Sequence, residues 1–329
     1  MNNNMKLVAA VVGCGRMGVG IAQVFAYAGH SVLLIDAKER AEEQRLKLAA
    51  FIKDQITANL SFLSRIGMVE KRMIPNIMAR INFYQVSQLN GVLSEANIIF
   101  EAVPEVLEIK KDVYTDISAL ATKDTIIAST TSTFLADQLA EYVSHAERFL
   151  CTHWLNPAYL MPLVEVSPGK ETAPEKLQHV FTLLEALGKI PVRCNPSPGF
   201  IVPRIQALAM NEAARLAEEG VASPEDIDKA SRFGFGLRFA VLGLLEFIDW
   251  GGGDILYYAG HNLHKTLGED RFLPPKVIVQ NMEQGRNGIK SGKGFFDYSQ
   301  CDLTKYQEET LTKFVDLLKH LGLMRSPVS

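Results

Sequence analysis

From residue 6 to residue 194, short apolar runs alternate with longer amphipathic segments. A short apolar run bounded by turn residues is typical of a buried strand, and apolar residues that recur every three or four positions are typical of a helix. The pattern predicts strands at residues 6–12, 31–35, 80–84, 97–103, 125–129, 148–153, 163–166 and 190–194. It predicts helices at residues 21–28, 38–63, 69–78, 89–96, 106–121, 136–143 and 174–187. Strands that alternate with helices indicate an α/β, doubly wound fold, in which helices cover both faces of a mainly parallel sheet.

A pair of helical segments interrupts this alternation. Residues 38–63 and 69–78 lie together between two predicted strands, so we expect a helical hairpin inserted into the sheet domain. The basic residues of the hairpin, Lys53 among them, are typical of a solvated helix face. Some of them could also reach a phosphate-bearing substrate, and the sequence does not choose between these roles.

The clearest domain boundary is the sequence Asn-Pro-Ser-Pro-Gly at residues 195–199, which has the composition of a linker. The helical signals beyond it lie at residues 202–219, 224–232 and 239–267. We therefore predict a sheet domain at residues 1–195 and an all-helical domain at residues 196–329. The apolar run at 241–248 suggests that the helical domain also forms a homodimer interface.

The first strand leads into the pattern Gly-x-Gly-x-x-Gly at residues 13–18, with Cys14, Arg16 and Met17 at the variable positions. In such a strand-turn-helix junction Gly13 permits the tight turn, Gly15 lets a diphosphate approach the backbone, and Gly18 lets the helix pack closely on its strand. The helix N-terminus then favours the negative charge of the diphosphate. The pattern alone occurs in ordinary turns as well, but its position predicts a Rossmann-type dinucleotide site.

Asp36 ends the second predicted strand. An acidic residue at this position accepts hydrogen bonds from the adenosine ribose and repels a 2′-phosphate, so it favours NAD over NADP. Lys38 and Arg40 lie close enough in the sequence to leave NADP open.

Composition places few further constraints. The chain has 329 residues, 47% of them hydrophobic and 22% charged, as in an ordinary globular protein of two domains. Its formal net charge of -3 gives no reason to expect a nucleic acid or an anionic membrane as a partner. The four scattered cysteines indicate reduced thiols and no metal site, and no targeting or membrane-spanning segment is recognisable, so we expect a cytoplasmic protein.

The chemistry-bearing residues follow the ends of predicted strands. His153 comes at the end of one strand and Glu165 lies on the next, and a histidine with a carboxylate on its second ring nitrogen is suited to take the proton of an alcohol. The hydroxyls of residues 129–133 could bind a substrate oxygen, and Glu105 could lie near the cofactor. Helix capping explains these hydroxyls and Glu105 equally well, and the spacing of His153 and Glu165 is also compatible with two unrelated residues.

Several motifs together resemble the 3-hydroxyacyl-CoA dehydrogenase family, in particular its short bacterial members similar to 3-hydroxybutyryl-CoA dehydrogenase. They are GCGRMG at 13–18, EAVPE at 101–105, ASTTST at 128–133, HWLNPAYLMPLVEV at 153–166, PGFIV at 198–202 and KSGKGFFDY at 290–298. Because these motifs occur in order through both predicted domains, the resemblance is to the family and not only to the fold.

The resemblance implies NAD-dependent, reversible oxidation of a short-chain (S)-3-hydroxyacyl-CoA by a homodimer. It implies that His153 is the catalytic base, that Glu165 orients it, and that Ser132 and Asn156 contact the substrate. It places Glu105 and Lys110 beside the cofactor, and Lys53 on the hairpin that binds CoA phosphates.

Three departures from the family pattern all concern the substrate. Pro203 and Thr130 replace asparagines that are usual in the family, and the hairpin is less basic. A CoA-free 3-hydroxy acid, as in the related gulonate and carnitine dehydrogenases, is therefore the alternative substrate class. A non-catalytic role, as in the crystallin relatives, is a further alternative, which the presence of both His153 and Glu165 disfavours.

Overall fold

The computed structural model of the chain describes residues 6–325. The chain divides into two compact units, of which the first ends at Leu208 and the second begins at Ala209. The first unit contains the strands β1 (Val8–Val12), β2 (Ser31–Asp36), β3 (Ile81–Gln85), β4 (Ile98–Glu101), β5 (Ile126–Ser129), β6 (Phe149–Trp154), β7 (Leu163–Pro168) and β8 (Ile190–Arg193). Its helices are α1 (Arg16–Tyr27), α2 (Glu42–Arg65), α3 (Ile74–Met78), α4 (Leu89–Val92), α5 (Leu107–Leu120), α6 (Ala136–Ala140) and α7 (Pro174–Ala186).

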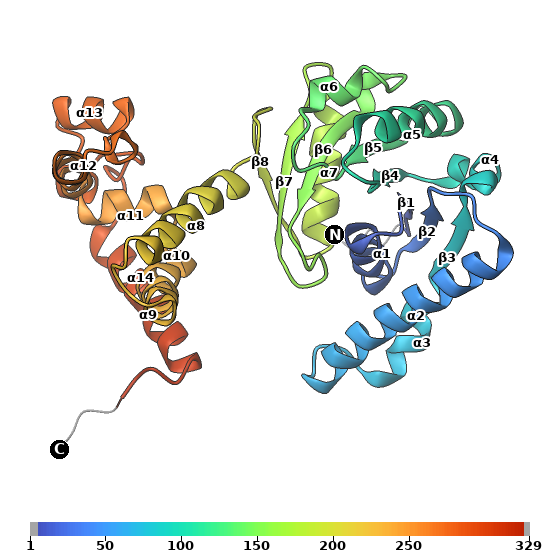
Figure 1. Ribbon diagram of the computed structural model, residues 1–329, viewed down its shortest axis with the longest axis horizontal. Helices are drawn as coiled ribbons and strands as arrows, with labels where there is room; N and C mark the ends of the chain where they lie inside the picture. Colours follow the sequence, from blue (N-terminus) through green and yellow to red (C-terminus); the bar gives the residue numbers. More distant parts are fainter. Residues whose placement is uncertain (1–5, 326–329) are drawn as a thin grey trace. The chain divides into compact units, whose positions relative to one another are not determined.

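The strands form one sheet in the order β3-β2-β1-β4-β5-β6-β7-β8 (Figure 1). Neighbouring strands are parallel except for β6 and β7, which are antiparallel. Only residues 155–162 connect β6 to β7, and a parallel crossover needs a dozen residues or more, so the chain turns back directly. The arrangement confirms the predicted Rossmann-type, mainly parallel sheet.

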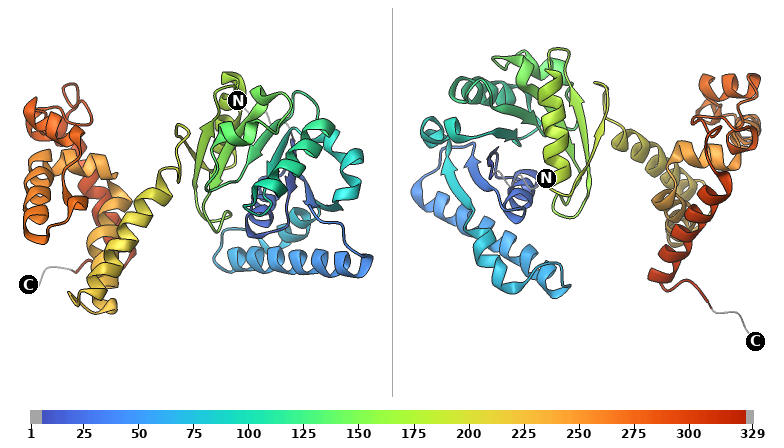
Figure 2. Two further views of the ribbon diagram at one scale, coloured as in Figure 1. Left: turned by 45° about the horizontal axis from the view of Figure 1, so that its top comes forward. Right: turned by 180° about the vertical axis from the view of Figure 1, so that it is seen from behind.

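Both faces of the sheet are buried under helices (Figures 1 and 2). Side chains alternate between the faces, so that Ala9 and Val11 of β1 pack with α1, α2, α3 and α7, whereas Ala10 and Val12 pack with α4, α5 and α6. Strands buried on both sides are apolar throughout, which is why the sequence displays them as uninterrupted apolar runs.

The predicted helical hairpin between β2 and β3 is present as α2 and α3, but both helices start later than predicted. Helix α2 begins at Glu42 and not at residue 38, because the backbone N–H groups of Lys38 and Arg40 donate to the side chains of Asp36 and Gln85 at the ends of β2 and β3. Helix α3 begins at Ile74, next to Pro75, whose ring is well suited to the first turn of a helix.

Helix α8 (Val202–Glu218) begins in the first unit and continues into the second. The second unit is otherwise built from α9 (Pro224–Ala230), α10 (Leu237–Val241), α11 (Leu244–Gly251), α12 (Gly253–Leu267), α13 (Lys276–Glu283) and α14 (Leu303–His320). Among the described residues, no helix has the length and apolar character needed to cross a membrane.

The motif at residues 290–298 stabilises this second unit. The buried carboxylate of Asp249 accepts hydrogen bonds from the backbone N–H groups of Phe295 at 3.0 Å and Phe296 at 2.9 Å. A Cβ at Gly294 would overlap this carboxylate, so the glycine is needed for the close approach. The motif therefore holds a loop against α11.

Candidate active site

The carboxyl ends of five strands meet at one edge of the sheet. The register aligns one residue from each strand in a single row: Ile35, Val12, Glu101, Ser129 and Cys151. The glycine turn, Asp36, the loop at residues 130–133 and His153 all follow this row. Ligands of open α/β sheets bind at this edge.

The three glycines of the turn have different environments. Gly13 has a φ of 122°, and a Cβ there would overlap the carbonyl of Ala102, the residue directly after β4. A Cβ at Gly18 would overlap the carbonyl of Gly13, so this glycine allows α1 to lie against the turn. A Cβ at Gly15 would meet no atom within 4 Å, and this side of the backbone is therefore open for a ligand. The turn fits the diphosphate of a dinucleotide.

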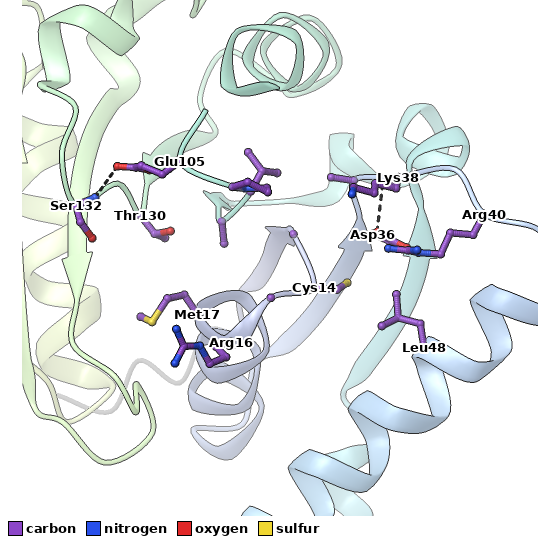
Figure 3. A pocket seen from close by; sticks show the side chains of 16 residues that line it. Cys14, Arg16, Met17, Asp36, Lys38, Arg40, Leu48, Glu105, Thr130 and Ser132 are labelled. Atoms are coloured by element: carbon purple, nitrogen blue, oxygen red, sulfur yellow. Dashed lines mark hydrogen bonds and ion pairs between the residues drawn. The ribbon is translucent and has the colours of Figure 1, made fainter. Parts of the chain in front are cut away.

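A pocket of about 590 Å³ lies over this turn (Figure 3). Its size is that of an ordinary cofactor site. Figure 3 shows Glu105, Thr130 and Ser132 on one side of the glycine turn and Asp36, Lys38 and Arg40 on the other, with Arg16, Met17 and Leu48 also in the wall. Predicted cofactor residues from three separate segments, residues 13–17, Asp36 and Glu105, are thus brought together with the predicted substrate residue Ser132.

The glycine turn yields a test of the cofactor site. We expect Gly15→Ala to weaken NADH binding by about tenfold or more, because the methyl group occupies the space where the diphosphate contacts the backbone. Since the φ of Gly15 is -77° and its Cβ would meet no protein atom, the fold should be unaffected. Fluorescence titration with NADH and thermal unfolding measure the two effects. Gly18→Ala serves as the contrast, because there the fold itself should be destabilised.

Cys14 lines the pocket, but its thiol is not activated for reaction. Burial, with the nearby Asp36 carboxylate, raises the pKa of the Cys14 thiol to about 12. A thiol that stays protonated is a poor nucleophile. All four cysteines are free.

Glu105 fastens the loop that carries Ser132. Its Oε1 accepts hydrogen bonds from the backbone N–H groups of Ser132 and Thr133, each at 3.0 Å, and from the hydroxyls of Thr131 and Thr133. Burial would raise the pKa of Glu105, but the hydrogen bonds from Thr131 and Thr133 and the ammonium of Lys110 outweigh it, and the pKa is lowered. Ser132 itself is exposed on the pocket wall.

Lys110 lies behind this wall and not in it. The side chain is 1% exposed, and its Nζ contacts both carboxylate oxygens of Glu101, at 2.8 and 3.0 Å, as well as Glu105 Oε2 at 3.2 Å. Lys110 is not one of the described residues that line the pocket. The structure thus places Lys110 where it positions Glu105, whereas direct contact with the cofactor stays a prediction.

Glu101 is a buried member of this network that the sequence analysis did not single out. Its carboxylate also accepts hydrogen bonds from Ser129 Oγ at 2.8 Å, from the backbone N–H of Val103 at 2.9 Å and from the hydroxyl of Tyr114. The available signal was a glutamate directly after the apolar run of β4, followed by a lysine and a tyrosine on one face of the next helix. A buried carboxylate is stable only when it is paired and hydrogen-bonded, and here the partners come from the turn after β4, from α5 and from β5.

His153 and Glu165 are paired. His153 lies within β6, just before its last residue, and it is the direct cross-strand neighbour of Glu165 in the antiparallel β7. The distance from His153 Nδ1 to Glu165 Oε2 is 2.7 Å, and both side chains are buried. The sequence predicts His153 at the end of its strand; the structure extends the strand by one residue to Trp154, and the register fixes the partner of His153.

Two features around this pair were not predicted. The ring of Phe200 stacks on the imidazole of His153, with centroids 4.9 Å apart and an interplanar angle of 20°. The other oxygen of Glu165, Oε1, accepts hydrogen bonds from the backbone N–H groups of Ile201 at 2.7 Å and Val202 at 3.0 Å, where α8 begins. Glu165 therefore holds both the histidine and the start of α8, and the first unit extends beyond the linker to include this turn.

The remaining predicted substrate residues are less closely associated with the pocket. Asn156 is exposed in the turn after β6, and Pro203 is the second residue of α8. Lys53 lines a separate apolar pocket between α2, α3 and β3, whereas Leu48 lines the pocket over the glycine turn. The structure therefore does not bring Lys53 together with the glycine turn, because a helix carries residues 48 and 53 on different faces.

Comparisons with known proteins agree with this geometry. Residues 8–197 match the family model of the NAD-binding domain of 3-hydroxyacyl-CoA dehydrogenase, and residues 199–298 match the family model of its C-terminal domain. This match confirms the predicted NAD cofactor. It also covers the glycine turn, His153 and Glu165.

Individual relatives fall into more than one substrate class. The chain is 31% identical to 5-formyl-3-hydroxy-2-methylpyridine 4-carboxylate 5-dehydrogenase of Mesorhizobium japonicum, over 93% of this chain and 95% of that protein. It is 33% identical to a probable 3-hydroxybutyryl-CoA dehydrogenase of Bacillus subtilis, over 88% of this chain and 96% of that protein. The crystal structure of the 3-hydroxyacyl-CoA dehydrogenase of Archaeoglobus fulgidus is similar with a TM-score of 0.75 and 30% identity, and covers 97% of this chain and 100% of that chain. The protein is an oxidoreductase, and its chain belongs to the 3-hydroxyacyl-CoA dehydrogenase family.

Proposed function

We propose that the protein oxidises the 3-hydroxyl group of a short-chain (S)-3-hydroxyacyl-CoA to the 3-oxo group, reversibly and with NAD. The observation that carries this proposal is the 2.7 Å pair of His153 and Glu165 at the sheet edge that also bears the glycine turn. Oxidation of a secondary alcohol needs a base for the hydroxyl proton and an acceptor for the hydride. The two requirements are met at one edge of one sheet.

The hydrogen bond to Glu165 defines how His153 acts. A carboxylate only accepts, so Nδ1 of the neutral imidazole carries the proton and Nε2 keeps a lone pair. Nε2 takes the proton of the substrate hydroxyl while the C3–H bond breaks and the C3–O bond becomes double. NAD supplies the hydride acceptor when it is bound. Glu165 stabilises the imidazolium that forms, and stacking on Phe200 restricts the ring to one plane.

Ser132 and Asn156 are proposed to bind the C3 oxygen and fix the substrate. The position of Ser132 on the pocket wall supports this role, and the hydrogen bond from its backbone N–H to Glu105 keeps it there. Glu105, Arg16, Met17 and Asp36 are proposed to contact the cofactor from the same pocket. A crystallin-like, non-catalytic role is excluded if any substrate yields NADH at an enzymatic rate.

A CoA-free hydroxy acid is the second candidate substrate class. One argument for it is the relative that acts on a pyridine carboxylate. The other is Lys53, the residue expected to bind CoA phosphates, which does not line the pocket over the glycine turn. An anionic substrate of this kind needs a local cation, and Arg16, which is also proposed to contact the cofactor, lies on the pocket wall.

A substrate panel tests the proposal. We expect NADH absorbance to rise with (S)-3-hydroxybutyryl-CoA and to stay flat with the (R) enantiomer, and the panel should include longer acyl-CoAs, gulonate and carnitine. Efficient turnover of a free acid together with no turnover of any CoA ester would replace the first substrate class by the second. Free 3-hydroxybutyrate is the matched control for the CoA group.

We further propose a homodimer formed through the helical domain, with residues 1–195 binding NAD and residues 196–329 serving the substrate and the dimer. Support comes from large apolar side chains exposed on helices of the second unit, among them Met210, Ile255, Tyr258 and Leu311. Sedimentation velocity measures the mass directly. The cytoplasmic location stays a prediction.

A further inference from the structure

The acidic residue that selects NAD is joined to a cation in this chain. Asp36 Oδ2 lies 2.5 Å from Arg40 Nε, and Asp36 Oδ1 accepts a hydrogen bond from the backbone N–H of Lys38 at 3.2 Å. The Asp36 side chain is only 6% exposed, whereas Arg40 is 32% exposed and lines the pocket beside it (Figure 3). The sequence predicts that Asp36 faces the ribose without a charged partner. In the structure, Asp36 forms an ion pair with the guanidinium of Arg40.

Arg40 is held in this position from two sides. Its backbone N–H donates to Gln85 Oε1 at 3.0 Å, at the end of the neighbouring strand β3, while its Nε is bonded to Asp36. Within residues 6–325, the side-chain hydrogen bond of Arg40 comes from Nε, and neither of its terminal Nη atoms makes one. The guanidinium thus keeps donors free at the end of the pocket that also contains Lys38.

The electrostatic consequence concerns the 2′ position of the adenosine ribose. A lone carboxylate at the end of β2 repels a 2′-phosphate, whereas a nearby arginine accommodates one. Here two cations, Arg40 and Lys38, stand beside one anion in the pocket wall. Free guanidinium donors match the oxygens of a phosphate, and such charge-assisted bonds are the strong ones.

We propose that Arg40 gives this pocket affinity for the 2′-phosphate of NADP(H), so that the protein binds NADP(H) in addition to NAD(H). This inference rests on the proposed dinucleotide function of the same pocket. Asp36 still accepts from an unmodified ribose, since each carboxylate oxygen has a second lone pair. Arg40 is then the residue that determines how far the two cofactors are discriminated.

Nucleotide binding without any substrate tests the inference. NADH and NADPH are titrated into the protein by fluorescence, and 5′-AMP and 2′,5′-ADP are used as competitors that differ in their phosphate position. We expect Arg40→Ala to weaken NADPH and 2′,5′-ADP binding by about tenfold or more, the scale of one or two charge-assisted hydrogen bonds, and to leave NADH binding within about threefold. Arg40→Gln, which keeps the polar reach but not the charge, should behave in the same way.

Arg45→Ala is the matched control. Arg45 is 31% exposed and pairs with Glu42 on the same segment, but it does not line the pocket, so its loss should change neither affinity. If Arg40 serves only to orient Asp36, both Arg40 variants should weaken NADH binding and the wild-type protein should not bind NADPH; either result overturns the inference. Failure to bind either dinucleotide would instead contradict the proposed function.

Discussion

His153→Ala should lower kcat by about 10²–10⁴-fold, the usual contribution of a positioned general base. The imidazole is the proton acceptor in the proposed reaction, and no second histidine is available in the strand pair that carries it. NADH binding should persist, because the glycine turn and Asp36 make the proposed cofactor contacts. Steady-state turnover of (S)-3-hydroxybutyryl-CoA and fluorescence titration with NADH measure the two properties separately.

His179→Ala is a suitable control for that variant, because His179 is exposed on α7 and should not affect turnover. Equal loss of turnover and of NADH binding in His153→Ala would contradict the catalytic role and indicate a folding role instead. Circular dichroism of each variant separates the two readings.

Glu165→Gln probes the same pair from the other side. If the amide oxygen takes over the backbone N–H groups of Ile201 and Val202, the amide N–H₂ is left facing His153 Nδ1. The imidazole must then accept at Nδ1 and carry its proton at Nε2, which is the wrong tautomer for a base. Turnover should fall nearly as far as in His153→Ala, and the double variant should be no worse than the single ones, since the two residues act as a unit.

Glu101→Leu should have the largest effect on stability. It leaves the ammonium of Lys110 buried with only Glu105 at 3.2 Å, and removal of one partner of a buried ion pair costs about 3–5 kcal/mol. The hydroxyls of Tyr114 and Ser129 lose their acceptor as well. Denaturant unfolding monitored by circular dichroism measures the loss.

Two further variants decide the cause of that loss. Glu108→Ala, at an exposed position in the first turn of α5, should cost less than about 1 kcal/mol. Combining Glu101→Leu with Lys110→Met removes both buried charges and should recover much of the stability, as apolar replacements of buried ion pairs commonly do. If the double variant is as unstable as Glu101→Leu alone, the ion pair is not the reason for the loss.

Much of the site could be predicted from local sequence. The glycine turn, Asp36 at the end of β2 and the loop 130–133 after β5 each follow an apolar strand, and parallel strands bring their carboxyl ends to one edge. Motif resemblance then singled out His153 and Glu165. Their separation of 12 residues gave no geometry, and their contact depends on the antiparallel direction of β7.

Other predictions depended on which way a side chain points. Lys53 and Lys110 look alike in the sequence, as basic residues on amphipathic helices. The structure buries Lys110 against Glu101 and directs Lys53 to a separate pocket. Helix phase relative to the sheet determines this difference, and small errors in a predicted helix start change it.

The sequence by itself determined the strand-helix alternation, the dinucleotide turn and the identity of the histidine-glutamate pair, because each of these depends on residues close in the chain or on recognisable motifs. Only the tertiary structure decided three contacts. Glu165 accepts hydrogen bonds from the start of α8, Lys110 forms a buried ion pair with Glu101, and Arg40 forms an ion pair with Asp36. Each of these contacts depends on the packing or direction of side chains, and for Glu165 and Glu101 on elements brought together by the strand order. That arrangement is a property of the whole sheet and not of any single segment.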